Sequence, residues 1–205
     1  MEIAKGIRNS DYERLNLSGF DSKDWLVAIE FLEKRLSERF IEPIEILIES
    51  ESGKSASEKK FGFTILAIDC MLAETIQSFY EGVVNSTGKS KEIFKRFLRE
   101  RESFKNYFTS DKEAEEFYKD FRCGILHQSQ TTGETLIWSV GKLINKINGQ
   151  IIVNRDIFHH AIKNELKIYL EELKKRKDQQ LLQNFKIKMD YISEIRKVPK
   201  SISKL

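Results

Sequence analysis

Apolar residues recur at every third or fourth position through most of the chain, which is the spacing of amphipathic helices. A first helix is expected after a cap at Asp21 or Ser22, and Pro43 is expected to end or kink it. Its apolar face is formed by Trp25, Ile29, Leu32, Leu36 and Phe40. Residues 44–49 fit either a strand or a continued helix, and the polar residues 50–60 predict a loop.

The second predicted helix, at about 61–84, is the most apolar segment, and residues 63–73 are hydrophobic on nearly all sides. This pattern indicates a helix at the centre of a bundle. Asp69 interrupts the main apolar face, and Glu74 lies on another side of the same helix. Because an isolated buried carboxylate is costly, we expect Asp69 to have a partner. Either acid could instead cap a helix, pair with a lysine or reach solvent.

Two further helices are predicted beyond a turn at Gly82 to Gly88. One spans about 89–108 with phenylalanines on its inner face, and the next is capped by Asp111. Glu113 falls in the first turn of that next helix, where the helix dipole favours a negative charge.

The hydrophobic spacing then changes to that of strands over residues 134–153. Asn148-Gly149 within this segment is a strong hairpin signal, so we expect a small β-hairpin or three-stranded flap inserted between helices. A fifth helix is predicted to start within 154–156 and a sixth to span 178–197, followed by a basic tail at 197–205.

These elements predict a mainly α fold, a bundle of five to six helices with a small inserted β-hairpin near 134–153. Residues 1–20 are weakly patterned and predict an N-terminal arm, and 21–205 predict a single helical domain. A hydrophobic content of 40% and only 2 prolines fit such a domain. The two cysteines, Cys70 and Cys123, fall in apolar helical contexts and are interpreted as free thiols of a reducing cytoplasm.

No apolar run approaches the length of a membrane span, and the first residues lack the apolar core of a signal peptide, so a cytoplasmic protein without a membrane segment is expected. Metal binding is not expected, because the cysteines and the 3 histidines show no ligand spacing. No nucleotide-loop or nucleophile-elbow motif is present, so no cofactor is expected either.

The net charge of +3 is unevenly distributed, because the segment from Lys174 onward holds ten basic and three acidic residues. A second basic cluster occurs on the predicted third helix. Such clusters are either solvated helix faces or contacts to a nucleic-acid backbone. The residues proposed for nucleic-acid binding are Lys95, Arg96, Arg99, Lys174, Lys175, Arg176 and Lys177.

Arg122 and His127 stand five positions apart around Gly124, at the end of the predicted fourth helix. A permanently charged guanidinium and a group that titrates near neutral pH are suited to chemistry on a phosphodiester. On a regular α-helix, however, these two positions are about 140° apart around the axis. The glycine and the polar run after Gln128 indicate a loosened helix end, which would allow another geometry.

The Arg122 to His127 pattern, with four residues between the two, resembles the signature of the HEPN superfamily, whose members are small helical proteins that include many ribonucleases. The resemblance implies a HEPN-like bundle and an antiparallel homodimer whose two motifs face one cleft. It also implies metal-independent cleavage of single-stranded RNA to 2′,3′-cyclic phosphate and 5′-hydroxyl ends. The chain departs from the family at Cys123, where Asn, Asp or His is usual.

In that interpretation His127 transfers protons and Arg122 holds the phosphate. Asp69 or Glu74 would orient one of them, while Cys123 and Tyr118 would support the site and Tyr118 could stack on a base. His159 and His160 are second-choice bases. A role in stress response, a toxin–antitoxin pair or phage defence follows from the same resemblance, with an antitoxin or another protein as a further partner.

Two other interpretations stay open. Cys123 could mark a lost site in a non-catalytic HEPN-like module that binds nucleotide, RNA or protein. Alternatively, Arg122 could bind backbone carbonyls and His127 could be a structural residue of the bundle, while the cationic C-terminal helix docks an acidic partner.

Overall fold

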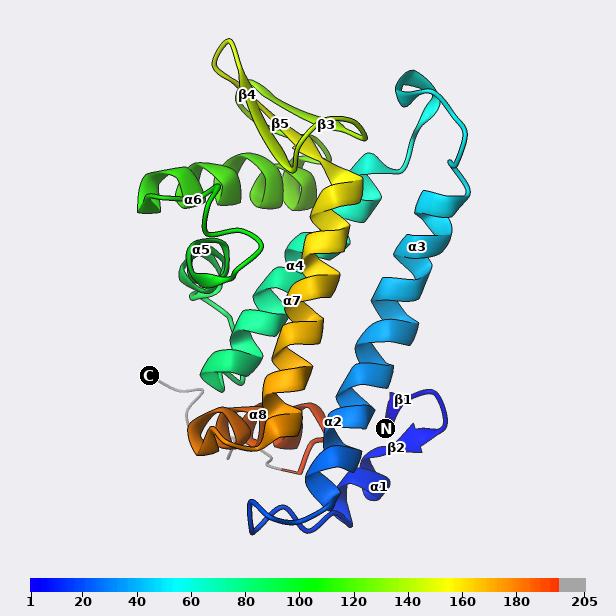
Figure 1. Ribbon diagram of the computed structural model, residues 1–205, viewed down its shortest axis with the longest axis vertical. Coiled ribbons are helices and arrows are strands. Elements are labelled where there is room, and N and C mark those ends of the chain that lie inside the picture. The colour runs from blue at the N-terminus through cyan, green and yellow to red at the C-terminus, as the bar shows by residue number, and fades with distance from the viewer. Residues whose placement is uncertain (196–205) are drawn as a thin grey trace. The chain divides into compact units, whose positions relative to one another are not determined.

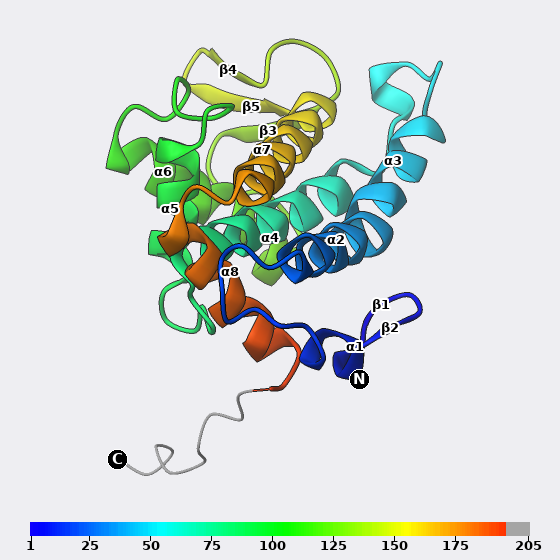
Figure 2. The same ribbon diagram turned by 60° about the horizontal axis from the view of Figure 1, so that its bottom comes forward.

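The computed structural model describes residues 1–195, and the predicted basic tail lies outside this range. The described chain is mainly helical with a small sheet near 134–153, as the hydrophobic spacing predicted (Figures 1 and 2). A second small sheet, within residues 2–8, was not predicted. The backbone divides into two compact units, the first made of 1–39, 78–85 and the residues from 169 onward, the second of 40–77 and 86–168. Whether 21–205 behave as one domain stays a prediction.

The first unit holds the short strands β1 (Glu2–Ala4) and β2 (Ile7–Arg8) and three helices, α1 (Asn9–Glu13), α2 (Asp24–Leu36) and α8 (Gln179–Ile192). The ends of two long helices, α4 (Gly62–Glu81) and α7 (Arg155–Lys175), complete it. Trp25 and Phe185 pack ring against ring in its core. Residues 1–20, expected to form an arm, contribute buried side chains, and the Tyr12 hydroxyl donates to Asp190.

The second unit contains most of the remaining elements. They are α3 (Glu42–Glu49), a 3-10 turn (Ala56–Glu58), the first part of α4, α5 (Ser90–Glu100), α6 (Asp111–Phe117), the π-helix η3 (Tyr118–Gln128), β3 (Thr135–Trp138), β4 (Ile144–Ile147), β5 (Gln150–Asn154) and the first part of α7. Phenylalanines fill its core, and the rings of Phe117 and Phe158 stack 5.8 Å apart. This packing fixes the end of α6, from which η3 continues.

The hairpin prediction at Asn148-Gly149 is confirmed. Both residues have positive φ, 51° and 86°, which a tight turn between β4 and β5 requires. The sheet has the order β3-β5-β4, with β3 parallel to β5 and β4 antiparallel to it. In Figure 1 this sheet lies beside α6 and the start of α7, and Lys146 of β4 contacts Glu113 of α6.

Several predicted boundaries were wrong. The helix expected at about 89–108 ends at Glu100, because the following turn is held from another element, the Ser103 amide donating to the buried Glu165 carboxylate of α7. Ser110, rather than Asp111, caps α6, since its hydroxyl accepts from the Glu113 amide. Helix α8 ends at Ile192, short of the predicted 197.

The region around Pro43 is a helix interrupted by one π-turn. A π-helical segment, Ser37–Ile41, separates α2 from α3, and Pro43 lies in the first turn of α3, where its missing amide hydrogen costs no hydrogen bond. The ambiguous residues 44–49 are therefore helical.

Among residues 1–195, α4 is the one helix with the length and composition to cross a membrane. Most of its apolar stretch is buried inside the protein, and the core helix of a folded domain has the same composition. The absence of a membrane segment therefore stays a prediction.

Candidate functional site

The motif residues lie on a π-helix, not on an α-helix. Helix η3 follows α6 without a break and ends at Ser129, which has a positive φ of 57°. In a π-helix each amide bonds to the carbonyl five residues earlier, so residues five apart sit roughly above one another on one side. On a regular α-helix, Arg122 and His127 would lie on different sides. On this π-helix their positions lie on roughly the same side.

The guanidinium of Arg122 is held by Glu74 of α4. Its Nε lies 2.5 Å from Oε1 of Glu74, and its Nη2 lies 3.3 Å from Oε2. The exposed fractions of the two side chains are 17% and 10%, so the pair is largely shielded from water. Burial alone would lower the pKa of Arg122, but the hydrogen bonds and charge of Glu74 raise it. Arg122 is thus fixed as a cation, with Nη1 free of the Glu74 contact.

Two further side chains complete this cluster. The Ser90 hydroxyl, at the start of α5, donates to Oε2 of Glu74 over 2.6 Å. The Tyr118 ring lies under the guanidinium of Arg122, 5.4 Å from ring centre to Cζ, and its hydroxyl is 3.4 Å from the Ser90 oxygen. Three helices therefore position one arginine. Ser90 was missed by the sequence interpretation because a lone serine near a helix start usually serves as a cap.

Cys123 is half-buried and belongs to the same cluster. Burial raises the pKa of the Tyr118 hydroxyl, and the neighbouring Cys123 thiol adds to this shift. The thiol therefore lies close to an aromatic neighbour of Arg122. A thiol is a weak hydrogen-bonding group, which limits what Cys123 can offer a ligand.

His127 is exposed at the end of η3. Directly after it the chain turns back over Gly124, where an added Cβ would lie 2.7 Å from the carbonyl oxygen of Gln130. The return is fixed by Asp120, whose backbone carbonyl and carboxylate accept hydrogen bonds from the Thr132 amide and hydroxyl at 3.0 and 2.9 Å. The imidazole therefore stands in solvent on a structured helix end.

Asp69 is not part of the Arg122 cluster. Its carboxylate contacts Nδ1 of His159 on α7 over 2.9 Å, and both side chains are completely buried. Burial raises the pKa of Asp69 to about 6, against the hydrogen bond from His159, which lowers it. His159 is thereby a core residue, whereas His160 is exposed. Of the two acids singled out in the sequence, Glu74 is the one that meets Arg122.

The basic residues of α5 are partly neutralised. Lys95 is almost fully buried and lies 3.0 Å from Asp111 and 3.3 Å from Glu92. The exposed Arg99 also contacts Asp111, and Arg96 is half-exposed. The ion pairs hold α5 against α6, so Lys95 is a structural cation.

Of the four basic residues at 174–177, at the end of α7 and just after it, two are held by other residues of the described chain and two are not. Lys174 lies 2.8 Å from Glu33, and Arg176 donates to two backbone carbonyls near the start of α2. Lys175 and Lys177 are exposed. These two are the residues of the run whose charge is presented to solvent.

Within residues 1–195, no group of three or more histidine, cysteine or acidic side chains is placed to hold a metal ion. The expectation of metal independence stays a prediction. No family model, curated protein or solved structure matches this chain. The arguments for function therefore rest on the geometry of these side chains.

Proposed function

We propose that this chain is a metal-independent endoribonuclease of HEPN type that cleaves single-stranded RNA. The supporting observation is the arrangement on η3, where Arg122 is clamped by Glu74 and the exposed His127 follows after one turn of π-helix. A fixed cation and an accessible imidazole on one helix are the minimum needed to bind a phosphodiester and move a proton.

In the proposed reaction His127 takes the proton from a ribose 2′-hydroxyl. The 2′-oxygen attacks the adjacent phosphorus, the bond from phosphorus to the 5′-oxygen breaks, and that leaving oxygen takes up a proton. The products are a 2′,3′-cyclic phosphate and a 5′-hydroxyl. Arg122 would donate to the phosphate oxygens while their negative charge grows, through the Nη1 that Glu74 leaves free.

A homodimer is part of the proposal, because the reaction needs one group to accept a proton and another to supply one. Each chain offers one His127 on its η3. Two copies of the motif facing one cleft would give the scissile bond a base on one side and an acid on the other. We expect the specific activity to fall on dilution in parallel with dissociation of the dimer, as measured by light scattering.

RNA binding would be aided by exposed cations. Lys175 and Lys177 present charge to solvent and can release counterions from a phosphate backbone. A role in stress response, toxin–antitoxin biology or phage defence is the setting in which such a nuclease would act, with a neutralising protein partner.

A non-catalytic module that binds nucleotide, RNA or protein is the second candidate, and one observation favours it. Two of the three guanidinium nitrogens of Arg122 already contact Glu74, so much of its hydrogen-bonding capacity is used within the chain. Cys123 stands where the family usually has an amide, carboxylate or imidazole. In that case Arg122 would stabilise the fold, and His127 would have no catalytic role.

The decisive experiment is incubation of single-stranded RNA with purified protein in excess EDTA. Wild type and His160→Ala should cleave, because His160 is an exposed histidine outside the site. His127→Ala should lose at least about a hundredfold in rate, the typical contribution of a positioned acid or base. End analysis should find cyclic phosphates on the wild-type products.

The substitution Arg122→Lys distinguishes the effect of the positive charge from the effect of the planar guanidinium group. It keeps the cation but loses the planar two-point contact, so cleavage should fall while RNA binding is largely retained. Equal rates for wild type and His127→Ala, or a dimer that never cleaves RNA, would overturn the nuclease proposal. If Cys123→Asn alone restores cleavage, the chain is a decayed enzyme of the second kind.

A further inference from the structure

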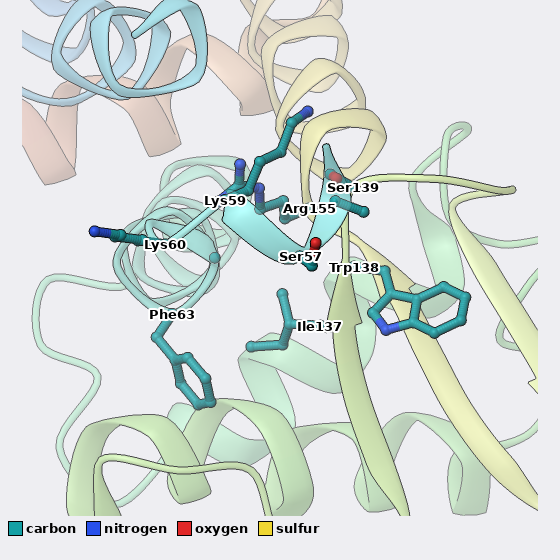
Figure 3. Close-up of a pocket in the computed structure, with 10 residues that line it drawn as sticks. Ser57, Lys59, Lys60, Phe63, Ile137, Trp138, Ser139 and Arg155 are labelled. Carbon is teal, nitrogen blue, oxygen red and sulfur yellow. The ribbon is translucent and has the colours of Figure 1, made fainter. Parts of the chain in front are cut away.

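A second site is suggested by a cavity of about 400 Å³ at the start of α4, which involves neither Arg122 nor His127. Its walls come from the 3-10 turn at Ala56–Glu58 and the residues after it, from the first turn of α4, from β3 and from Arg155 at the start of α7 (Figure 3). All of these belong to the second unit. The volume is in the range of sites for single small molecules.

The charged side chains that line this cavity are all basic. Lys59, Lys60 and Arg155 contribute to the lining, and no carboxylate does. Arg155 is buried and contacts Glu51, while Lys59 lies 3.4 Å from Asp156. Neither acid is among the lining residues. An anionic ligand is therefore favoured over a cationic one.

Lys60 is the cation of this set that is available to a ligand. It is exposed, and its ammonium makes no ion pair within residues 1–195. Figure 3 shows the side chains of Lys59 and Lys60 extending outward from the rim, away from Ile137. The flexible stem of Lys60 allows its ammonium group to reach a phosphate at the cavity. The amides of Gly62 and Phe63, in the first turn of α4, have no acceptor within the helix.

The apolar part of the lining indicates that the ligand is more than a simple anion. Phe63 and Trp138 are 43% and 45% exposed, which is unusual for large aromatic residues, and they flank Ile137 on two sides (Figure 3). Exposed aromatic rings beside a basic cavity suit the face of a nucleobase. Ser139 also lines the cavity, and its buried hydroxyl oxygen has no hydrogen-bond partner in the described chain.

We propose that this cavity binds a nucleoside phosphate, with the base stacked on Trp138 and the phosphate neutralised by Lys60. The ligand could be a free mononucleotide or one nucleotide of an RNA strand, because both present the same base and phosphate. The proposal does not depend on RNA cleavage, since none of its residues touches the Arg122 cluster.

Tryptophan fluorescence gives a direct measurement, because the chain has two tryptophans and Trp25 is buried while Trp138 is exposed. AMP should quench the emission in a saturable way. Adenosine and inorganic phosphate, tested separately, should each bind at least about tenfold more weakly, since each supplies half of the contacts. A 2′-O-methyl oligoadenylate cannot be cleaved through a 2′-hydroxyl. If it binds more tightly than AMP, the ligand of the cavity is a nucleotide of an RNA strand.

Variants measured by calorimetry test the assigned contacts. Trp138→Ala should weaken AMP binding about tenfold, in line with the loss of one base stack, and Trp138→Phe should retain most of it. Lys60→Gln should weaken binding several-fold and reduce its salt dependence. Lys54→Gln is the matched control, because Lys54 is an exposed lysine of the same loop outside the cavity lining.

The outcomes separate this proposal from the ribonuclease. AMP binding that persists in His127→Ala supports the cavity whether or not RNA is cleaved. No saturable binding of AMP or the oligonucleotide, phosphate binding as tight as AMP, or equal affinities in Lys60→Gln and Lys54→Gln would each overturn it. If Trp138→Ala does not fold, the comparison of Lys60→Gln with Lys54→Gln still tests the proposal.

Discussion

The Nε atom of Arg122 donates to Oε1 of Glu74 over 2.5 Å, joining the π-helix η3 to the central helix α4. Both side chains are largely buried, and the carboxylate accepts a second hydrogen bond from Ser90. The pair therefore has two consequences. It gives Arg122 one orientation, and it leaves a buried charge uncompensated if either partner is removed.

We expect Arg122→Ala to lower the free energy of unfolding by about 3–5 kcal/mol, the usual cost of breaking a buried ion pair from one side. Urea unfolding followed by circular dichroism measures this change. Combining it with Glu74→Gln should recover part of the loss, because the stranded carboxylate is then gone. Arg14→Ala is the control, since the Arg14 side chain is 78% exposed and its change should stay within about 0.5 kcal/mol. Equal losses for the two arginines would mean that the pair contributes little to the fold.

Hydrophobic spacing was sufficient to predict the helices and the hairpin, because both depend on short-range chemistry. Apolar periodicity marks the buried face of α4, and Asn148-Gly149 takes the positive φ values that a tight turn needs. The end of α5 could not be predicted in this way. It depends on the contact from Glu165, a residue 62 positions away from Ser103 in the sequence.

Only part of the candidate site could be predicted from the sequence. The motif itself is local, but the π-helix that brings positions five apart to one side has no recognised sequence signal. The partner of Arg122 lies 48 positions earlier, and Asp69 and Glu74 were equal candidates for it. Tertiary packing decides between them, since Asp69 faces His159 in the core.

Gly124→Ala should destabilise the protein and reduce any RNA cleavage. Alanine is the better helix former, but its Cβ would lie 2.7 Å from the carbonyl oxygen of Gln130, a backbone atom that cannot turn away. Displacing the return segment should cost about 1–3 kcal/mol, as overpacking usually does. Thermal unfolding and the RNA assay measure the two effects.

The matched control for that substitution is Gly19→Ala. An added Cβ at Gly19 meets nothing within 4 Å, so the change should be neutral or slightly stabilising. If Gly124→Ala is as well tolerated as Gly19→Ala, the close approach of 130–132 to η3 is not needed, and the position of His127 does not depend on it.

The buried pair of Asp69 and His159 should make stability depend on pH. Burial raises the pKa of Asp69 from 3.8 to about 6, so between these values the folded protein binds more protons than the unfolded chain. The contribution of Asp69 is complete below pH 3.8 and is lost as the pH rises through about 6, a loss of about 3 kcal/mol in the free energy of unfolding. Urea unfolding at successive pH values from 4 to 7 measures the slope.

Asp69→Asn should remove this part of the slope, because asparagine keeps a hydrogen bond to Nδ1 of His159 without a titrating charge. At pH 7 the variant should be at least as stable as wild type, since the cost of a buried carboxylate is gone. Asp21→Asn, on an exposed side chain, should retain the wild-type slope. A slope unchanged in Asp69→Asn would show that Asp69 is ionised in the folded protein throughout this pH range. The imidazole of His159 would then have to stabilise the negative charge despite complete burial.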